Sequence, residues 1–278
     1  MSKGVVIFAY NSKINYVDIA TVAAKLVKKH LGLPVTLITN IIDVDRAVFD
    51  TVIYSELDGA AYDRVFKFSS SNERMPWHNQ NRSSVYDLSP YDQTLLIDAD
   101  YLIFNNELVK LFDTNLEFAC YNRVYDITGS TELQRDARVG NPGIPMQWAT
   151  VIYFTRNELA KSVFGFMQDI KKNYMYYAAA YNFTAHLFRN DYTLSIALQA
   201  LTGYNTTHFT SIPGALISVD TSVDIHEVRP NGEIVFSWQR SETNLIKITK
   251  VKNTSIHIMN KKSITDATIL NQLHGLTQ

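Results

Sequence analysis

Short apolar runs alternate with amphipathic stretches along the first half of the chain. Residues 5–9 and 35–39 are largely apolar over the length of a strand, as expected for strands that are buried on both faces. Between them, residues 18–31 carry apolar side chains at helical spacing, and Gly32 and Pro34 predict the end of that helix. Shorter strands are predicted at residues 52–54, 64–68 and 95–97. This alternation predicts an α/β fold with a mostly parallel sheet that helices cover on both faces.

The second half of the chain is more mixed. Residues 149–154 predict another buried strand, residues 158–177 predict a helix, and residues 191–201 predict a short helix that Asn190 caps. Short strand patterns follow at residues 217–219, 234–238, 245–248 and 255–259. No repeat, low-complexity tract or change of composition marks a linker. We therefore expect a single domain over residues 1–278 with two halves, at about 1–125 and 126–278.

Polar residues follow several of the predicted strands. Tyr10 and Asn11 come after the first strand, Thr39 and Asn40 close the second, and two aspartates follow the strand at residues 95–97. In open α/β sheets, ligands bind beyond the carboxyl ends of the strands. We expect these polar side chains to gather at that edge.

Two carboxylates, Asp98 and Asp100, interrupt the apolar run at residues 94–104. A charge among buried neighbours costs several kcal/mol unless a metal ion or a positive group compensates it. Their spacing of two sends both side chains to the same side of an extended segment, where they can converge on one cation. Alternatively, the strand ends at Ile97 and the aspartates are solvated turn residues or a helix cap. The apolar residues 101–104, which follow without Gly or Pro, favour the first interpretation.

Composition narrows the protein class. With 278 residues, of which 46% are hydrophobic and 19% charged, the chain is ordinary globular material. Its formal net charge of −1 gives no overall attraction to nucleic acid, although a local patch could still bind it. Cys120 is the only cysteine, which excludes an intramolecular disulfide and a cysteine-based zinc site. The chain also has no signal segment before residue 5 and no stretch of membrane-spanning length, so we expect a cytoplasmic location.

With these features in place, the sequence resembles the GT-A glycosyltransferases, and within them the glycogenin-like family 8 enzymes and their relatives. The likeness covers most of the chain in the order and spacing of elements, but only short pieces at the level of residues. Those pieces are the Asp-X-Asp motif at Asp98 and Asp100, the upstream Arg82, the strand at residues 147–154, the helix start at Asn190-Asp191-Tyr192, and His257 within Ser255-Ile256-His257-Ile258-Met259. The resemblance implies a Rossmann-like central sheet with a nucleotide-sugar-binding first half and a mixed α+β acceptor-binding second half.

The resemblance also implies roles for individual residues. Asp98, Asp100 and His257 would bind a divalent metal ion, with Asp98 also placed to contact the ribose. Oxygen ligands favour Mn²⁺ or Mg²⁺, and the imidazole shifts the preference toward Mn²⁺. The residues that would bind the donor, a UDP-sugar, are Arg82, either Lys261 or Lys262 at the phosphates, and Tyr10, Asn11, Thr39 and Asn40 at the base and ribose.

Asp191 would act on the acceptor or the reacting sugar. A single carboxylate near the anomeric carbon serves as a base in an inverting enzyme or as a positioning group in a retaining one. Structural alternatives exist for several of the assigned residues, and in them Lys261 and Lys262 are solvated charges. His257 is then a packing residue of an apolar strand, Arg82 a surface charge before a helix, and Asp191 a first-turn acid that the helix dipole favours.

The sequence departs from the family pattern near its end. The family motif His-X-X-Gly-X-X-Lys-Pro-Trp is here His257-Ile258-Met259-Asn260-Lys261-Lys262-Ser263, with lysines one or two places early and no Pro-Trp. Asn260 can adopt the left-handed conformation that glycine would supply. Trp148 stands where an amide is customary, beside Gln147.

We therefore expect a metal-dependent glycosyltransferase that uses a nucleotide-diphosphate sugar. One alternative is a non-catalytic nucleotide-sugar-binding protein. Another is a sugar-phosphate nucleotidyltransferase, which needs a Gly-rich loop where this chain has residues 9–13. A third is a phosphatase of the haloacid dehalogenase type, which has Thr or Val two residues after its Asp-X-Asp motif. Leu102 at that position speaks against it.

The acceptor is open at the level of sequence. In general character, though in no single motif, the chain resembles glycosyltransferases of large bacteriophages, some of which modify hydroxymethylcytosine in DNA. A phage origin would place the protein in the host cytoplasm. Carbohydrate, lipopolysaccharide and protein acceptors are equally open.

Overall fold

The computed structural model describes most of the chain. The described residues are 1–56, 62–67, 72–78, 81–129, 138–141, 143–184, 188–204, 210–239 and 245–277. Phe68, the last residue of one predicted strand, lies outside them.

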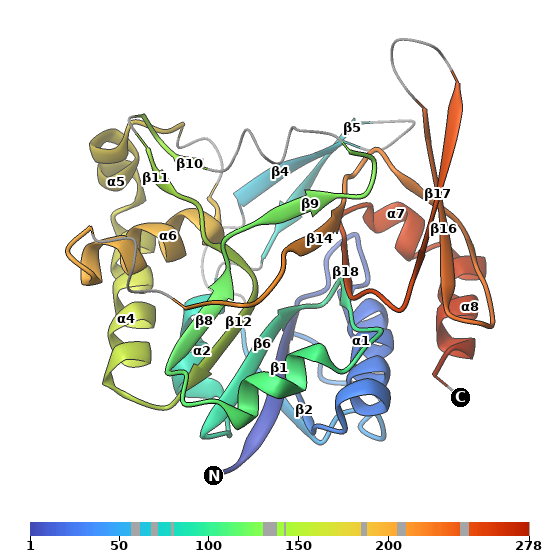
Figure 1. The fold of residues 1–278 in the computed structure, drawn as a ribbon, viewed down its shortest axis with the longest axis horizontal. Helices are drawn as coiled ribbons and strands as arrows, with labels where there is room; N and C mark the ends of the chain where they lie inside the picture. Colours follow the sequence, from blue (N-terminus) through green and yellow to red (C-terminus); the bar gives the residue numbers. More distant parts are fainter. Residues whose placement is uncertain are drawn as a thin grey trace.

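A seven-stranded sheet forms the centre of the molecule, in the order β13-β8-β12-β6-β1-β2-β3 (Figure 1). The sheet is parallel except at β12, which runs antiparallel to β6 and β8. Its strands are β1 (Lys3–Ala9), β2 (Val35–Thr39), β3 (Thr51–Tyr54), β6 (Gln93–Asp98), β8 (Phe118–Tyr121), β12 (Trp148–Thr155) and β13 (Thr210–Ser211). β1, β2 and β12 are almost wholly buried, in agreement with their apolar sequences. The predicted class, a mostly parallel central sheet flanked by helices, is confirmed.

Smaller sheets surround the central one. A four-stranded sheet has the order β7-β18-β14-β9, and a three-stranded antiparallel sheet has the order β15-β16-β17. Two hairpins, β4-β5 and β10-β11, complete the set within the described residues. The bounds are β4 (Tyr62–Lys67), β5 (Asn72–Trp77), β7 (Tyr101–Leu102), β9 (Val124–Asp126), β10 (Arg138–Val139), β11 (Ile144–Pro145), β14 (Leu216–Val219), β15 (Asp224–Val228), β16 (Glu233–Gln239), β17 (Ile246–Lys252) and β18 (Ile256–Ile258).

Helices lie along two flanks of the central sheet (Figure 1). α1 and α8 lie on one flank, and α4 and α6 on the other. The helices and 3-10 turns are α1 (Tyr16–Leu31), η1 (Arg82–Ser84), α2 (Val85–Leu88), η2 (Glu107–Asp113), α4 (Glu158–Lys172), α5 (Tyr174–Tyr181), α6 (Asn190–Leu201), α7 (Lys261–Ile264) and α8 (Ala267–Gly275). α1 begins at its cap Asn15 and ends at Gly32, whose φ of 65° is left-handed, as the sequence predicts for the end of this helix. In the part of the chain that the structure describes, no helix combines the length and apolar character needed to cross a membrane.

Two helix predictions need correction. The single helix predicted at residues 158–177 is two helices, because Asn173 caps the end of α4 and bonds back to Asp169 with its amide. Asn190 does not cap α6. The N-cap is Arg189, whose backbone is extended, and Asn190 is the buried first residue of the helix.

The acidic run at residues 94–104 also differs from the expectation of one extended strand. β6 ends at Asp98, a turn holds Ala99 and Asp100, and β7 then enters the four-stranded sheet. The alternative interpretation is therefore correct about the turn but wrong about solvation, since the Asp100 side chain is 7% exposed. The turn, rather than the pleat of a strand, brings the two carboxylates together.

Most of the buried side chains form one hydrophobic cluster, which runs from Val5 in β1 to Leu276 near the end of the chain. It includes residues of both predicted halves. The division at about residue 125 stays a prediction.

Two glycine substitutions test the packing of β1 and α4. A Cβ at Gly4 would lie 2.3 Å from the Tyr91 ring, which is buried and held by a 2.9 Å hydrogen bond between its hydroxyl and that of Thr36. Gly165, in α4, is exposed with no atom near its Cβ position. We expect Gly4→Ala to lower the free energy of unfolding by about 1–3 kcal/mol and Gly165→Ala to raise it by roughly 0.5–1 kcal/mol. Urea denaturation measures both, and a Gly4→Ala protein as stable as the unsubstituted one would contradict the packing.

Candidate active site

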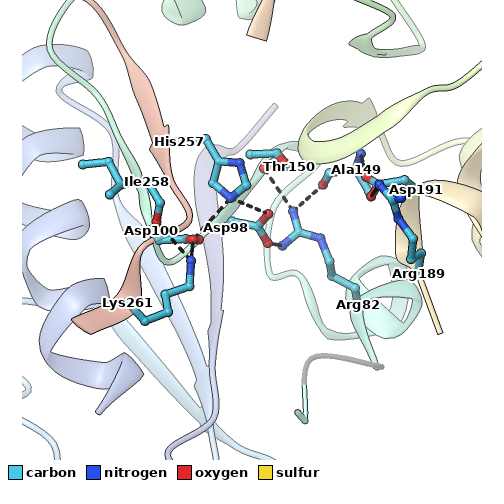
Figure 2. A network of polar contacts seen from close by, with 10 residues as sticks. All are labelled: Arg82, Asp98, Asp100, Ala149, Thr150, Arg189, Asp191, His257, Ile258 and Lys261. Atoms are coloured by element: carbon cyan, nitrogen blue, oxygen red, sulfur yellow. Dashed lines mark hydrogen bonds and ion pairs between the residues drawn. The ribbon is translucent and has the colours of Figure 1, made fainter. Parts of the chain in front are cut away.

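Asp98, Asp100 and His257 meet where the chain leaves the central sheet (Figure 2). Asp98 ends β6 and lies opposite Phe8 of β1. Asp100 follows in the turn, where its carbonyl accepts a 2.9 Å hydrogen bond from the Ile258 N–H. His257 lies on β18, which pairs antiparallel with β7. The site is thus assembled at the junction of two sheets.

The geometry of this Asp-Asp-His group suits a metal ion. His257 Nε2 lies 3.2 Å from Asp100 Oδ2 and 3.8 Å from Asp98 Oδ2. One ligand atom from each residue lies within 4.8 Å of the others, and their side chains are 7 to 19% exposed. Two carboxylate oxygens and one imidazole nitrogen are ligands that divalent metal ions take in proteins. The predicted residues converge, and their role as metal ligands stays a prediction.

Arg82 contacts Asp98, and its side chain is almost fully buried. Its guanidinium contacts Asp98 Oδ1 and donates to the carbonyl oxygens of Ala149 at 2.7 Å and Thr150 at 3.2 Å. The register of β12 against β8 shifts between Trp148 and Ile152, so both carbonyls belong to an irregular stretch of strand. With 2% of its side chain exposed, Arg82 is no surface charge. Its contact with a donor stays a prediction.

Asp191 lies on the far side of Arg82 from Asp98 (Figure 2). Its Oδ1 accepts the Ala149 N–H at 2.8 Å, and its Oδ2 lies 3.4 Å from Arg189. Ala149 therefore connects the two groups, because its N–H bonds to Asp191 and its carbonyl to Arg82. Asp191 is in the first turn of α6, as the alternative interpretation has it. A catalytic role stays a prediction.

Lys261 is the first residue of α7 and points into the site. Its ammonium contacts Asp100 Oδ2 and donates to the Ile258 carbonyl at 3.0 Å, and its side chain is 8% exposed. Lys262 instead contacts Glu73 of β5. Of the two lysines predicted for the phosphates, Lys261 is thus the one beside the acidic pair.

Asn260 does not take the left-handed conformation expected from the family pattern. Its φ is −77°, and its side chain caps α7 by accepting the Ser263 N–H at 3.1 Å. The amide also donates to the Val223 carbonyl at 3.0 Å and to Asp224 Oδ1 at 2.9 Å. The cap replaces the glycine turn and fixes the position of Lys261.

The residues predicted for the base and ribose lie together at the ends of β1 and β2. Asn40 accepts from the Asn11 N–H at 2.9 Å and donates to the Asn11 carbonyl at 3.3 Å. The Asn11 side chain accepts from the Val17 N–H at 2.9 Å, at the start of α1. Thr39 and Tyr10 are buried. In this arrangement the amides hold the loops in place, and contacts with a nucleotide stay a prediction.

The two carboxyl groups have opposite pKa shifts. Burial raises the pKa of Asp98 above its ordinary value, and this outweighs the charge of Arg82. Burial opposes ionisation of Asp100 as well, but Lys261 and His257 together hold its pKa well below the ordinary range. Asp100 is therefore the more firmly ionised member of the pair.

Sequence reasoning missed Arg189 and the capping role of Asn260. Arg189 stands two residues before Asp191 and gives no periodic signal in the sequence. Asn260 precedes Ser263 by three residues, which is the spacing of a helix cap. The backbone carbonyls that bind Arg82 leave no trace in the sequence.

Comparisons with known proteins give structural likeness alone. No protein-family model matches the chain, and no curated protein matches it. The glycosyltransferase GlyE of Streptococcus pneumoniae is similar at 15% identity and a TM-score of 0.43, covering 77% of this chain and 46% of GlyE. The galactosyltransferase LgtC, solved with donor and acceptor sugar analogues, is similar at 14% identity and a TM-score of 0.46, covering 70% of each chain. Mouse xyloside xylosyltransferase 1 is similar at 14% identity and a TM-score of 0.43, covering 72% of this chain and 82% of the mouse protein. This chain spans less than half the length of GlyE.

The depressed pKa of Asp100 predicts a pH-dependent stability. Its ionised form is favoured in the folded state, so its contribution is present above the unfolded pKa of about 3.9 and fades as the pH falls below it. We expect Asp100→Asn to lower the free energy of unfolding by about 3 kcal/mol or more at pH 5, because Lys261 loses its partner. That difference should shrink by about 1 kcal/mol at pH 3.

Urea denaturation at the two pH values measures this difference. Asp113→Asn is the matched control, since the Asp113 side chain is 75% exposed and its loss should change little at either pH. A difference for Asp100→Asn that grows at pH 3 would show that the sign is wrong.

Proposed function

We propose that this protein is a metal-dependent glycosyltransferase that takes a sugar from a nucleotide-diphosphate donor, a UDP-sugar. The observation that carries the proposal is the convergence of Asp98, Asp100 and His257 at the carboxyl edge of parallel strands. Such an edge is where open α/β sheets bind their ligands. The Asp-X-Asp motif that suggested the family supplies two of the three side chains.

The charge balance supports a diphosphate donor. Asp98 contacts Arg82 and Asp100 contacts Lys261, so the site is near neutrality before any ligand binds. A divalent cation and a diphosphate with two negative charges together preserve that balance. When bound, the cation supplies positive charge against the diphosphate that leaves as the glycosidic bond breaks.

The chain's own residues would hold and orient these groups. Asp98, Asp100 and His257 would hold the Mn²⁺ or Mg²⁺. Arg82 fixes the Asp98 carboxylate through its contact with Oδ1. Asp191 would act on the acceptor or the reacting sugar, and Ala149 and Arg189 fix the position of its carboxylate. Whether the reaction inverts or retains the anomeric configuration depends on where the acceptor binds.

For the acceptor we propose a glycan or hydroxymethylcytosine in DNA. A net charge of −1 offers no general attraction to DNA, so a DNA acceptor would require local phosphate contacts. Transfer of a labelled sugar to an oligosaccharide or to a hydroxymethylcytosine duplex, over a range of salt concentrations, separates the two. Transfer to DNA should weaken steeply as salt rises.

His257→Gln tests the metal-dependent reaction without leaving a buried charge unpaired. We expect the unsubstituted protein to release a nucleoside diphosphate from one of a panel of nucleotide sugars when Mn²⁺ is present. The release should stop when EDTA removes the metal ion. His257→Gln should raise the Mn²⁺ concentration for half-maximal rate at least about 10-fold. His226→Gln is the matched control, because His226 is exposed on β15.

The other outcomes of this assay identify the rival functions. Donor binding without release, even with acceptors present, would indicate a non-catalytic binding protein. Release of pyrophosphate from a nucleoside triphosphate and a sugar phosphate would indicate a nucleotidyltransferase. If no nucleotide sugar binds or reacts in a metal-dependent way, the proposed function is wrong.

Asp191→Asn tests the proposed role at the reacting sugar. We expect the turnover number to fall by about 100-fold or more, with a much smaller change in UDP affinity in Mn²⁺, because Asp191 contacts Ala149 and Arg189 rather than the acidic pair itself. Steady-state rates and calorimetric UDP titration measure the two quantities. Asp169→Asn, on α4, is the matched control, and unchanged turnover in Asp191→Asn would contradict the role.

A further inference from the structure

The ammonium of Lys261 contacts one carboxylate of the acidic pair, that of Asp100. Asp100 Oδ2 is in contact with Lys261 and lies 3.2 Å from His257 Nε2. That oxygen faces the same group of side chains that would hold a metal ion. A cation that binds through this oxygen must compete with the lysine for it.

The position of Lys261 is built into the fold. Asn260 caps α7 and bonds to Val223 and Asp224, which fixes the start of the helix. Lys261 follows directly, and its ammonium also bonds to the Ile258 carbonyl. Lys261 is 7% exposed, so the contact with Asp100 is shielded from water.

The charges around the site explain why this competition matters. Asp98 pairs with Arg82 and Asp100 pairs with Lys261, which gives two acids and two bases in side chains that are 2 to 19% exposed. A divalent cation alone would add two positive charges beside the ammonium, at a low local dielectric, where unbalanced charge is costly. A diphosphate brings the two negative charges that restore the balance, and it offers the ammonium new oxygen partners.

We propose that Lys261 is a positioning residue that makes the binding of metal and diphosphate depend on each other. Without a diphosphate, its ammonium holds Asp100 and weakens metal binding. With a diphosphate present, the ammonium moves to the phosphate oxygens and Asp100 is released to the metal. By linkage, the diphosphate strengthens metal binding by the same factor as the metal strengthens diphosphate binding. This inference rests on the metal site of the proposed function.

Equilibrium binding of Mn²⁺ tests the inference without using activity. Free Mn²⁺ is counted by its paramagnetic resonance signal, with and without UDP, and protein-free mixtures correct for the Mn²⁺ that UDP binds by itself. For the unsubstituted protein we expect UDP to lower the Mn²⁺ dissociation constant at least about 10-fold, within the range of known couplings. In Lys261→Met, Mn²⁺ alone should bind at least about 10-fold more tightly. The effect of UDP should be at least about 3-fold smaller than in the unsubstituted protein, and what remains is the direct attraction between the cation and the diphosphate.

Lys262→Met is the matched control. Lys262 is the next residue on α7 but contacts Glu73, so its loss should leave both the Mn²⁺ affinity and the effect of UDP unchanged. Lys261→Met also leaves Asp100 without its partner, which lowers stability. Thermal unfolding therefore provides a second readout: Mn²⁺ alone should raise the melting temperature of Lys261→Met by more than it raises that of the unsubstituted protein.

Three results would overturn the inference. If Lys261→Met binds Mn²⁺ no more tightly than the unsubstituted protein, or if UDP strengthens its Mn²⁺ binding by as large a factor as in the unsubstituted protein, Lys261 does not govern the coupling and the metal site itself stands. If neither protein binds Mn²⁺ with or without UDP, the metal site fails and the proposed function fails with it.

Discussion

The arrangement of the site depends on the cost of burying two ionised carboxylates. Asp98 and Asp100 lie two residues apart at the edge of the central sheet, where their side chains are 19% and 7% exposed. An isolated charge there would be too costly, so each needs a positive group within contact distance. Arg82 supplies one and Lys261 the other, from segments on opposite sides of the acidic pair in the sequence. η1 carries the first of these basic residues and α7 the second.

The rest of the site supports those two ion pairs. The shift in register along β12 turns the carbonyls of Ala149 and Thr150 toward Arg82, which satisfies donors that Asp98 alone does not. The N–H of Ala149 in turn holds Asp191. A local irregularity in one strand thus links the acidic pair to the carboxylate expected near the reacting sugar. On the other side of the acidic pair, the cap at Asn260 fixes the start of α7 and with it the position of Lys261.

The sequence was sufficient for features that depend on burial, and insufficient for those that depend on backbone detail. The apolar runs of β1 and β2 and the amphipathic pattern of α1 predicted the sheet and its covering helix, because strands buried on both faces have few alternatives. The energetic cost of charge in an apolar run drew attention to Asp98 and Asp100. The turn at Ala99 and Asp100 belonged only to the alternative interpretation, because the run contains neither Gly nor Pro. The break at Asn173 was missed because α5 continues with residues that suit a helix.

The spread of the site along the chain has a consequence for how the protein matures. Arg82, Asp98 and Asp100 are synthesised close together, whereas His257 and Lys261 follow more than 150 residues later. Until β18 and α7 dock, Asp100 has neither its cation nor its imidazole neighbour, so the interior at this edge cannot close at low cost. Residues 256–264 therefore complete the core and the site in one step. A protein interrupted before residue 256 lacks β18 and α7, and so loses this part of the core together with His257 and Lys261. The integrity of the fold is thereby coupled to the integrity of the site.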